Sequence, residues 1–108
     1  MRNVVYAIGA EEEFGYACAK LGLAYYKNGD YQEALEWYEK ALPIYEKTHG
    51  ADHPKTANVY NNIGCVHFNQ GHYTDAMLWF LKAYKIRLNK FGEEHRLTQE
   101  TKCSIRRT

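Results

Sequence analysis

The clearest pattern in this chain is a stripe of apolar residues with helical spacing between residues 31 and 45. Its members fall three or four positions apart: Tyr31, Ala34, Leu35, Tyr38, Ala41, Leu42 and Tyr45. Side chains at this spacing lie along one face of an α-helix. A second stripe has the same form: Tyr73, Ala76, Met77, Phe80, Ala83 and Tyr84. The pattern therefore predicts two amphipathic helices, over residues 30–49 and 72–91.

The two stripes belong to a longer stretch that occurs twice. Residues 21–53 recur as residues 63–95, at a constant distance of 42 positions. Identical pairs include Gly22/Gly64, Gly29/Gly71, Tyr31/Tyr73, Ala34/Ala76, Trp37/Trp79, Ala41/Ala83, Gly50/Gly92 and His53/His95. A fixed period of this size is typical of repeat proteins, in which each unit packs on its neighbour.

A shorter helix is expected before each stripe, over residues 12–27 and 54–70. Pro54 suits the first position of a helix, and Asp30 followed by Glu33 has the form of a capping box. The glycines suit the turns and the left-handed position just after a helix end: Gly29, Gly50, Gly71 and Gly92.

The pattern restarts near the C-terminus and predicts a fifth helix over residues 95–105. The organisation we expect is one domain over residues 1–108, with an N-terminal segment (1–11), two repeats (12–53 and 54–95) and a partial third repeat or capping helix (96–108). Gln99, Lys102 and Arg106 are expected to form its polar outer face. An apolar run in the N-terminal segment must be covered, either by folding back on the first hairpin or by docking on another chain: Val4, Val5, Tyr6 and Ile8.

These repeats resemble the tetratricopeptide repeat, whose pattern is W-x2-L-G-x2-Y…A-x3-F…A. The matching residues are Cys18, Leu21, Gly22, Tyr25, Ala34, Tyr38 and Ala41, and then Tyr60, Ile63, Gly64, His67, Ala76, Phe80 and Ala83. The resemblance implies an all-α fold of antiparallel helical hairpins stacked in a right-handed superhelix, with two repeats and a C-terminal capping helix. The 42-residue period and the Gly50-x2-His53-Pro54 motif look like the kinesin-light-chain subtype. Three residues depart from the family pattern, which has an aromatic residue at each place: Cys18, His67 and Lys102.

Composition changes this picture little. The 108 residues allow one core, and 14 basic against 13 acidic residues give a net charge of +1. No broad field would recruit nucleic acid or an anionic membrane. Three cysteines with no close pair argue against a disulfide framework and favour the cytoplasm, and the apolar run before Glu11 is too short for a signal peptide.

Nothing in the sequence supports catalysis, a metal site or a cofactor. His49 and His53 are four apart, but Gly50 between them should end the helix that would align their rings, so structural caps are the favoured interpretation. We expect the thiols of Cys65 and Cys103 to be buried or half-buried and reduced. The sequence lacks the nucleophile-elbow, phosphate-loop, zinc-protease and dinucleotide motifs.

The resemblance implies instead a protein-interaction module whose first helices line a concave groove. Projecting the family's groove positions selects Tyr16, Ala19, Lys20, Leu23, Tyr26 and Lys27 in the first repeat, and Asn58, Asn61, Asn62, Cys65, Phe68 and Asn69 in the second. Asparagine amides suit the backbone of an extended peptide, and aromatic rings offer flat apolar contact. The alternatives are that Asn61 and Asn62 bond neighbouring backbone or face water, and that Tyr26 and Phe68 are packing residues.

Three other functions have weaker support in the sequence. A clamp for a terminal carboxylate needs cations where Glu100 and Ser104 stand, so it is disfavoured. Nucleic-acid binding would rest only on Lys102, Arg106 and Arg107, a short cationic run that is usually solvated. The main alternative is a structural fragment that self-associates through its ends and holds no groove ligand.

Overall fold

The protein is an array of five α-helices. The computed structural model describes the backbone of residues 2–108 and the side chains of residues 9–108, and this described part contains no strand. The helices are α1 (Arg2–Lys27), α2 (Tyr31–Thr48), α3 (Pro54–Asn69), α4 (Tyr73–Phe91) and α5 (Arg96–Arg107). The predicted all-α fold of helical hairpins with a C-terminal helix is confirmed.

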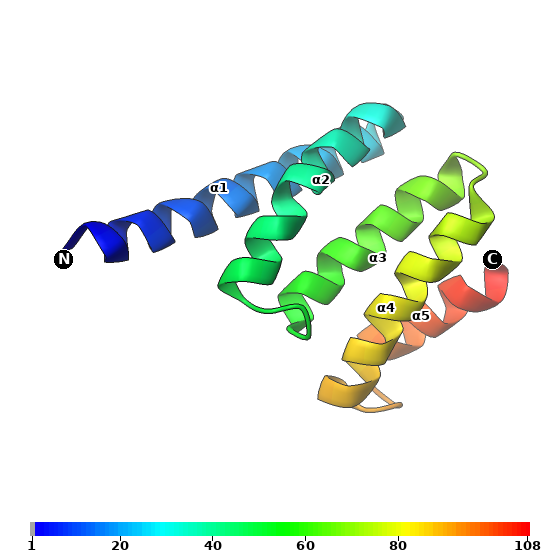
Figure 1. Ribbon diagram of the computed structural model, residues 1–108. Coiled ribbons are helices and arrows are strands. Elements are labelled where there is room, and N and C mark those ends of the chain that lie inside the picture. Colours follow the sequence, from blue (N-terminus) through cyan, green and yellow to red (C-terminus); the bar gives the residue numbers. More distant parts are fainter. Residues whose placement is uncertain (1) are drawn as a thin grey trace.

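The helices form two antiparallel hairpins and a final single helix (Figure 1). α1 pairs with α2 and α3 pairs with α4, while α2 lies beside α3 and α5 lies against α4. The resulting shape is flat, with principal extents of 49 × 33 × 19 Å. Each hairpin therefore contacts mainly its neighbour in sequence, as in other stacked repeats.

The predicted start of the first helix was wrong. We expected it near residue 12, but α1 begins at Arg2 and is 26 residues long, whereas α2 has 18. The start of α1 consequently projects beyond α2 (Figure 1). Residues 2–11 continue α1, so this segment does not fold back on the first hairpin, which was one of the two predicted ways of covering it. The side chains of Val4, Val5, Tyr6 and Ile8 lie outside the described residues.

The two long loops have the same construction. The backbone N–H of His53 donates to the carbonyl oxygen of Gly50, and that of His95 donates to the carbonyl oxygen of Gly92. Gly50 and Gly92 have φ of 99° and 87°, a region that favours glycine. The Nδ1 atoms of His53 and His95 then accept the backbone N–H two residues on, at 3.0 and 3.1 Å. Both histidines are thus helix N-caps, as predicted for His53.

The predicted capping box at Asp30 is wrong in its hydrogen bonds. Asp30 does occupy the N-cap position of α2, but its side chain makes no cap hydrogen bond. Its carboxylate instead accepts from the Nδ2 atom of Asn28, at 2.9 Å. The Asp30 carboxylate therefore bonds the Asn28 side chain in the turn and not the backbone N–H groups at the start of α2.

Within each hairpin an aromatic ring fills the space left by a glycine. Tyr38 packs on Gly22 and Phe80 packs on Gly64, and both rings are buried. The main core then joins the hairpins, because Leu35 and Tyr38 of α2 cluster with Ile63 and other apolar residues of α3. This packing fixes α1 and α3 relative to one another, and these two helices border a groove.

Candidate functional site

A groove lies between the two hairpins and is bordered by α1, the end of α2 and α3. This α1–α3 groove has a volume of about 450 Å³. It is lined by Glu12, Glu13, Tyr16 and Ala19 of α1, by Ile44, Tyr45, Thr48 and His49 at the end of α2, and by Lys55, Asn58, Val59 and Asn62 of α3. Four of the twelve projected groove residues therefore line one groove: Tyr16, Ala19, Asn58 and Asn62.

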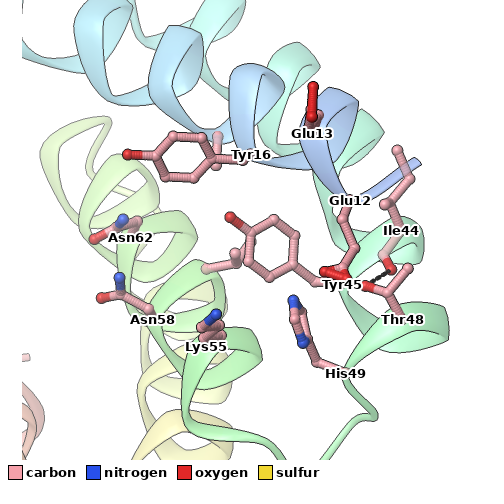
Figure 2. A pocket seen from close by; sticks show the side chains of 12 residues that line it. Glu12, Glu13, Tyr16, Ile44, Tyr45, Thr48, His49, Lys55, Asn58 and Asn62 are labelled. Atoms are coloured by element: carbon pink, nitrogen blue, oxygen red, sulfur yellow. Dashed lines mark hydrogen bonds between the residues drawn. The ribbon is translucent and has the colours of Figure 1, made fainter. Parts of the chain in front are cut away.

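Two tyrosines give the α1–α3 groove its apolar surface. Tyr16 of α1 and Tyr45 of α2 project into a space bordered on the far side by Asn58 and Asn62 (Figure 2). Tyr16 is 59% exposed, which is unusual for a large ring, whereas Tyr45 is half-buried against the core. Burial, with a smaller effect of Tyr16, raises the pKa of the Tyr45 hydroxyl. The Tyr45 hydroxyl is therefore neutral at pH 7 and available as a hydrogen-bond donor.

The charges of the α1–α3 groove lie on opposite rims. Glu12 and Glu13 are on α1, and Lys55 is on α3 (Figure 2). All three side chains are exposed. A ligand lying across the groove would therefore meet negative charge at α1 and positive charge at the start of α3.

Asn58 has a structural bond as well as a place in the α1–α3 groove. Its Oδ1 atom accepts from a guanidinium nitrogen of Arg87, at 3.2 Å. Arg87 is only 2% exposed, and it also donates to the Oγ1 atom of Thr101, at 2.7 Å. The side chain thus joins α3, α4 and α5. Burial lowers the pKa of Arg87, although an arginine remains charged at any physiological pH.

Sequence reasoning missed Arg87. The residue stands 42 positions after Tyr45, where the first repeat has an aromatic ring. Nothing in the apolar periodicity distinguishes a buried arginine from an exposed one. Its partners, Asn58 and Thr101, lie 29 and 14 residues away, so only the assembled fold reveals the bond.

A second, smaller hollow lies where the ends of α1, α3 and α5 meet. It has a volume of about 260 Å³ and is lined by Tyr26, Cys65, Phe68, Asn69, Phe80, Ser104 and Arg107. The Nδ2 atom of Asn69 donates to the Tyr26 hydroxyl at 2.9 Å and to the Cys65 carbonyl at 2.8 Å. Tyr26 packs against the core and Phe68 makes an edge contact with Tyr73. These contacts support the packing interpretation of Tyr26 and Phe68.

Asn61 faces α5 and not the first hairpin. It lines a wide surface between α3 and α5 together with Cys65, Arg96, Glu100 and Arg106. Its Oδ1 atom is buried without a hydrogen-bond partner among the described residues, and its Nδ2 atom lies 4.0 Å from the Cys65 Sγ. The structure therefore distributes the predicted asparagines over three surfaces.

Three predicted site residues of α1 line none of these hollows. Lys20, Leu23 and Lys27 are all exposed. The Lys20 ammonium lies 5.4 Å from the centre of the Tyr16 ring, so it can reach the edge of the α1–α3 groove. Leu23 and Lys27 lie farther along α1, near its end.

The family of the chain follows from comparison with known sequences. A sequence model described as "Tetratricopeptide repeat" matches residues 15–89, which is more than half of the chain. The chain belongs to the tetratricopeptide repeat family. A search of curated proteins found no match.

Tetratricopeptide repeat domains generally mediate protein interactions and act as scaffolds without catalytic activity. None of the described helices is both long enough and apolar enough to cross a membrane.

The thiols of this tetratricopeptide repeat chain differ in exposure. All three are free: Cys18 is buried, Cys65 is half-buried and Cys103 is exposed. The prediction of a buried or half-buried thiol is confirmed for Cys65 and wrong for Cys103. Burial raises the pKa of the Cys18 and Cys65 thiols, which keeps both in the protonated, unreactive form.

α5 closes the second hairpin of the repeat array through polar contacts. Thr98 and Thr101 are fully buried against α4. The predicted polar outer face is correct only for Arg106, which is exposed. Lys102 and Gln99 are half-buried, because Lys102 pairs with the Glu93 carboxylate at 2.7 Å and Gln99 donates to the Glu93 carbonyl. Of the predicted cationic run, Lys102 is therefore engaged within the chain.

Proposed function

We propose that this tetratricopeptide repeat chain binds an extended segment of a partner protein in the α1–α3 groove. The observation that carries the proposal is the position of Tyr16, a largely exposed aromatic ring beside Asn58 and Asn62. Exposed rings flanked by amide groups are common in peptide-binding surfaces, because the ring gives contact area and the amides bond the peptide backbone. Since both helices belong to packed hairpins, little ordering of the groove is needed on binding.

The lining of the α1–α3 groove specifies the chemistry of the segment. Tyr16 and Tyr45 suit one apolar or aromatic side chain, and Glu12 and Glu13 suit a lysine or arginine next to it. Lys55 on the opposite rim suits an acidic residue or a carbonyl-rich turn. The partner is therefore proposed to present a basic residue beside an apolar one.

The remaining predicted contacts have secondary places in this proposal. Asn61, Cys65, Asn69 and Tyr26 would extend the contact toward α5, and Lys20 would border the groove on α1. Leu23 and Lys27 would touch only a partner that extends past the end of the groove. A net charge of only +1 gives no reason to propose a nucleic-acid ligand.

Two further properties are proposed with the function. The 42-residue period and the twice-built Gly-x-x-His loop support membership of the kinesin-light-chain-like subtype. Three free cysteines support a reducing compartment such as the cytoplasm.

The test is selection from a random displayed peptide library on the immobilised full chain. We expect selected peptides to share a basic residue next to an apolar one. Tyr16→Ala should weaken their binding on the order of tenfold or more, because an aromatic anchor removed from a groove costs about 2 kcal/mol. Phe14→Ala is the matched control, since Phe14 lies on the same helix, is 56% exposed and does not line the groove.

The charged residues of the α1–α3 groove provide a second test of peptide binding. Glu12→Lys combined with Glu13→Lys should shift the selected sequences from basic to acidic. If no peptide is selected, or if every selected peptide binds Tyr16→Ala and the wild type equally, groove binding is wrong.

A second candidate function, self-association, is favoured by a different face of α1. Leu21 is 40% exposed, while Ile63, its counterpart in the second repeat, is 3% exposed because α2 covers it. Phe14 and Leu21 therefore present an apolar face for which the described residues supply no cover. Two copies of the chain could bury these faces against one another.

Sedimentation tests this second function independently of peptide binding. Self-association predicts that the wild type dimerises at micromolar concentration and that Phe14→Asp with Leu21→Asp is monomeric, whereas Tyr16→Ala still dimerises. A wild-type chain that stays monomeric at high micromolar concentration contradicts it.

A further inference from the structure

Three potential metal ligands meet at the turn between α3 and α4. His67 lies in the last turn of α3, His72 is the N-cap residue of α4, and Asp75 lies in the first turn of α4. One ligand atom from each residue lies within 4.8 Å of the other two. Among the described residues, this is the one group of three or more such side chains that converges in this way.

His67 has an unsatisfied nitrogen at this place. The side chain is half-buried, and its Nδ1 atom is buried with no hydrogen-bond partner among the described residues. A buried polar atom without a partner costs about 1–3 kcal/mol. A metal ion within reach of the ring would provide the missing interaction.

His72 is available because it does not cap its helix. The corresponding residues before α3 and α5, His53 and His95, use their Nδ1 atoms to accept a backbone N–H. The side chain of His72 makes no cap hydrogen bond, and its ring centre lies 5.8 Å from that of His67. Asp75 is exposed and takes part in none of the ion pairs found in the described residues.

The first repeat shows that the fold does not require these residues. Forty-two positions earlier stand Tyr25, Asp30 and Glu33, which include no imidazole. The tetratricopeptide pattern has an aromatic residue at the position of His67, and Tyr25 follows it. The two imidazoles are therefore a property of the second hairpin of this chain and not of the repeat.

We propose that His67, His72 and Asp75 bind a divalent transition-metal ion, with Zn²⁺ as the best fit. Zinc bonds of about 2.0–2.1 Å place tetrahedral ligand atoms about 3.4 Å apart, so atoms now within 4.8 Å must approach by at most about 1.4 Å. Rotation of the exposed His72 and Asp75 side chains provides this movement. Two imidazoles and one carboxylate favour zinc, copper or nickel over calcium or magnesium, which prefer oxygen ligands.

A bound ion would link the end of α3 to the start of α4 across the turn at Gly71. Because the ligands converge only in the folded hairpin, binding would stabilise the folded chain by mass action. Three protein ligands would leave a fourth position for water or for a side chain of a partner.

The experiment is titration of the untagged, chelator-treated full chain with Zn²⁺, Mg²⁺ and Ca²⁺, followed by calorimetry and thermal melting. We expect one Zn²⁺ per chain, a higher melting temperature with Zn²⁺, and no comparable effect of Mg²⁺ or Ca²⁺. Titration with Co²⁺ should give the visible absorption of a tetrahedral site.

The variants separate this site from the other histidines. His67→Tyr restores the residue type of the first repeat, and His72→Ala changes an exposed side chain, so both should fold. Each should weaken Zn²⁺ binding on the order of tenfold or more, since even outer partners of metal ligands cost 10–100-fold. His95→Asn is the matched control, because it removes an imidazole but keeps a capping side chain.

Equal Zn²⁺ affinity in the wild type and His72→Ala would overturn the proposal. Absence of Zn²⁺ binding at about 100 micromolar metal, which is on the order of the dissociation constants of weak metal sites in proteins, would also overturn it. Loss of binding in His95→Asn with retention in His67→Tyr would also overturn it.

Discussion

Gly22 and Gly64 decide how closely the helices of each hairpin approach. A Cβ atom on Gly64 would lie 2.7 Å from two ring atoms of Phe80, and one on Gly22 would lie 3.0 Å from the ring of Tyr38. Both rings are buried and hold the centre of their hairpins, so they have no free space to move into. The glycines are therefore required by side-chain packing and not by backbone conformation.

This contact predicts the effect of adding one methyl group. Gly64→Ala should lower the free energy of unfolding by about 1–3 kcal/mol, the usual cost of overpacking. Gly9→Ala is the control, because a Cβ atom there meets nothing within 4 Å, and it should raise stability by about 0.5–1 kcal/mol through helix propensity. Urea unfolding measures both. Equal behaviour of the two variants would contradict the packing described for Gly64.

The buried tyrosines predict how stability depends on pH. Burial raises the pKa of Tyr38 above its ordinary value near 10. The pKa of Tyr38 is higher in the folded chain than in the unfolded chain, so its neutral side chain contributes fully to the free energy of unfolding below about pH 10. That contribution is lost as the pH rises from about 10 toward the folded pKa. Tyr38→Phe should therefore lose less stability than the wild type between pH 8 and pH 11, measured by urea unfolding. An identical loss would show that Tyr38 is not the responsible group.

At the scale of elements, the repeat made four of the five helices predictable. α2 to α5 begin and end within two residues of the predicted bounds, because apolar periodicity, glycine turns and Pro54 all agree there. α1 was mispredicted at its start because residues 2–11 align, 42 positions on, with the end of α2 and the loop to His53. The repeat alignment therefore predicted a helix end and a loop for residues 2–11, which in the structure are the start of α1.

Pro43 lies inside α2 and predicts a bend in that helix. The helix α2 continues through it from Tyr31 to Thr48. A proline in a helix removes one amide donor and crowds the carbonyl four residues back, which is that of Glu39. We expect a bend between Glu39 and Tyr45, which a crystal structure would measure. A straight helix with a normal hydrogen bond to the Glu39 carbonyl would contradict this prediction.

The histidine caps make a separate element-scale prediction. His53→Ala should lower the free energy of unfolding by about 1 kcal/mol, because it leaves the Lys55 N–H without its acceptor. His72→Ala should have no such effect when measured with a chelator present, since His72 makes no cap bond. Thermal melting distinguishes them. The capping account fails if His72→Ala costs as much as His53→Ala.

At the scale of the whole molecule, side-chain contacts between hairpins were the part that sequence could not supply. The groove projection placed Asn58, Asn61 and Asn69 on a binding surface. Asn58 also bonds the buried Arg87, and Asn69 also bonds Tyr26. Helical spacing correctly assigned each to α3, but their partners lie on α4 and α1, where no local pattern points to them.

Binding of a partner segment in the α1–α3 groove is tested most directly by mapping a selected peptide on the ¹⁵N-labelled full chain. Amide and side-chain resonances are followed by NMR as the peptide is added. The largest shifts are expected at Tyr16, Tyr45, Asn58 and Asn62, with small shifts at the exposed leucines of α4, Leu78 and Leu81. The opposite pattern, with shifts concentrated on α4 and none in the groove, would contradict the proposed function.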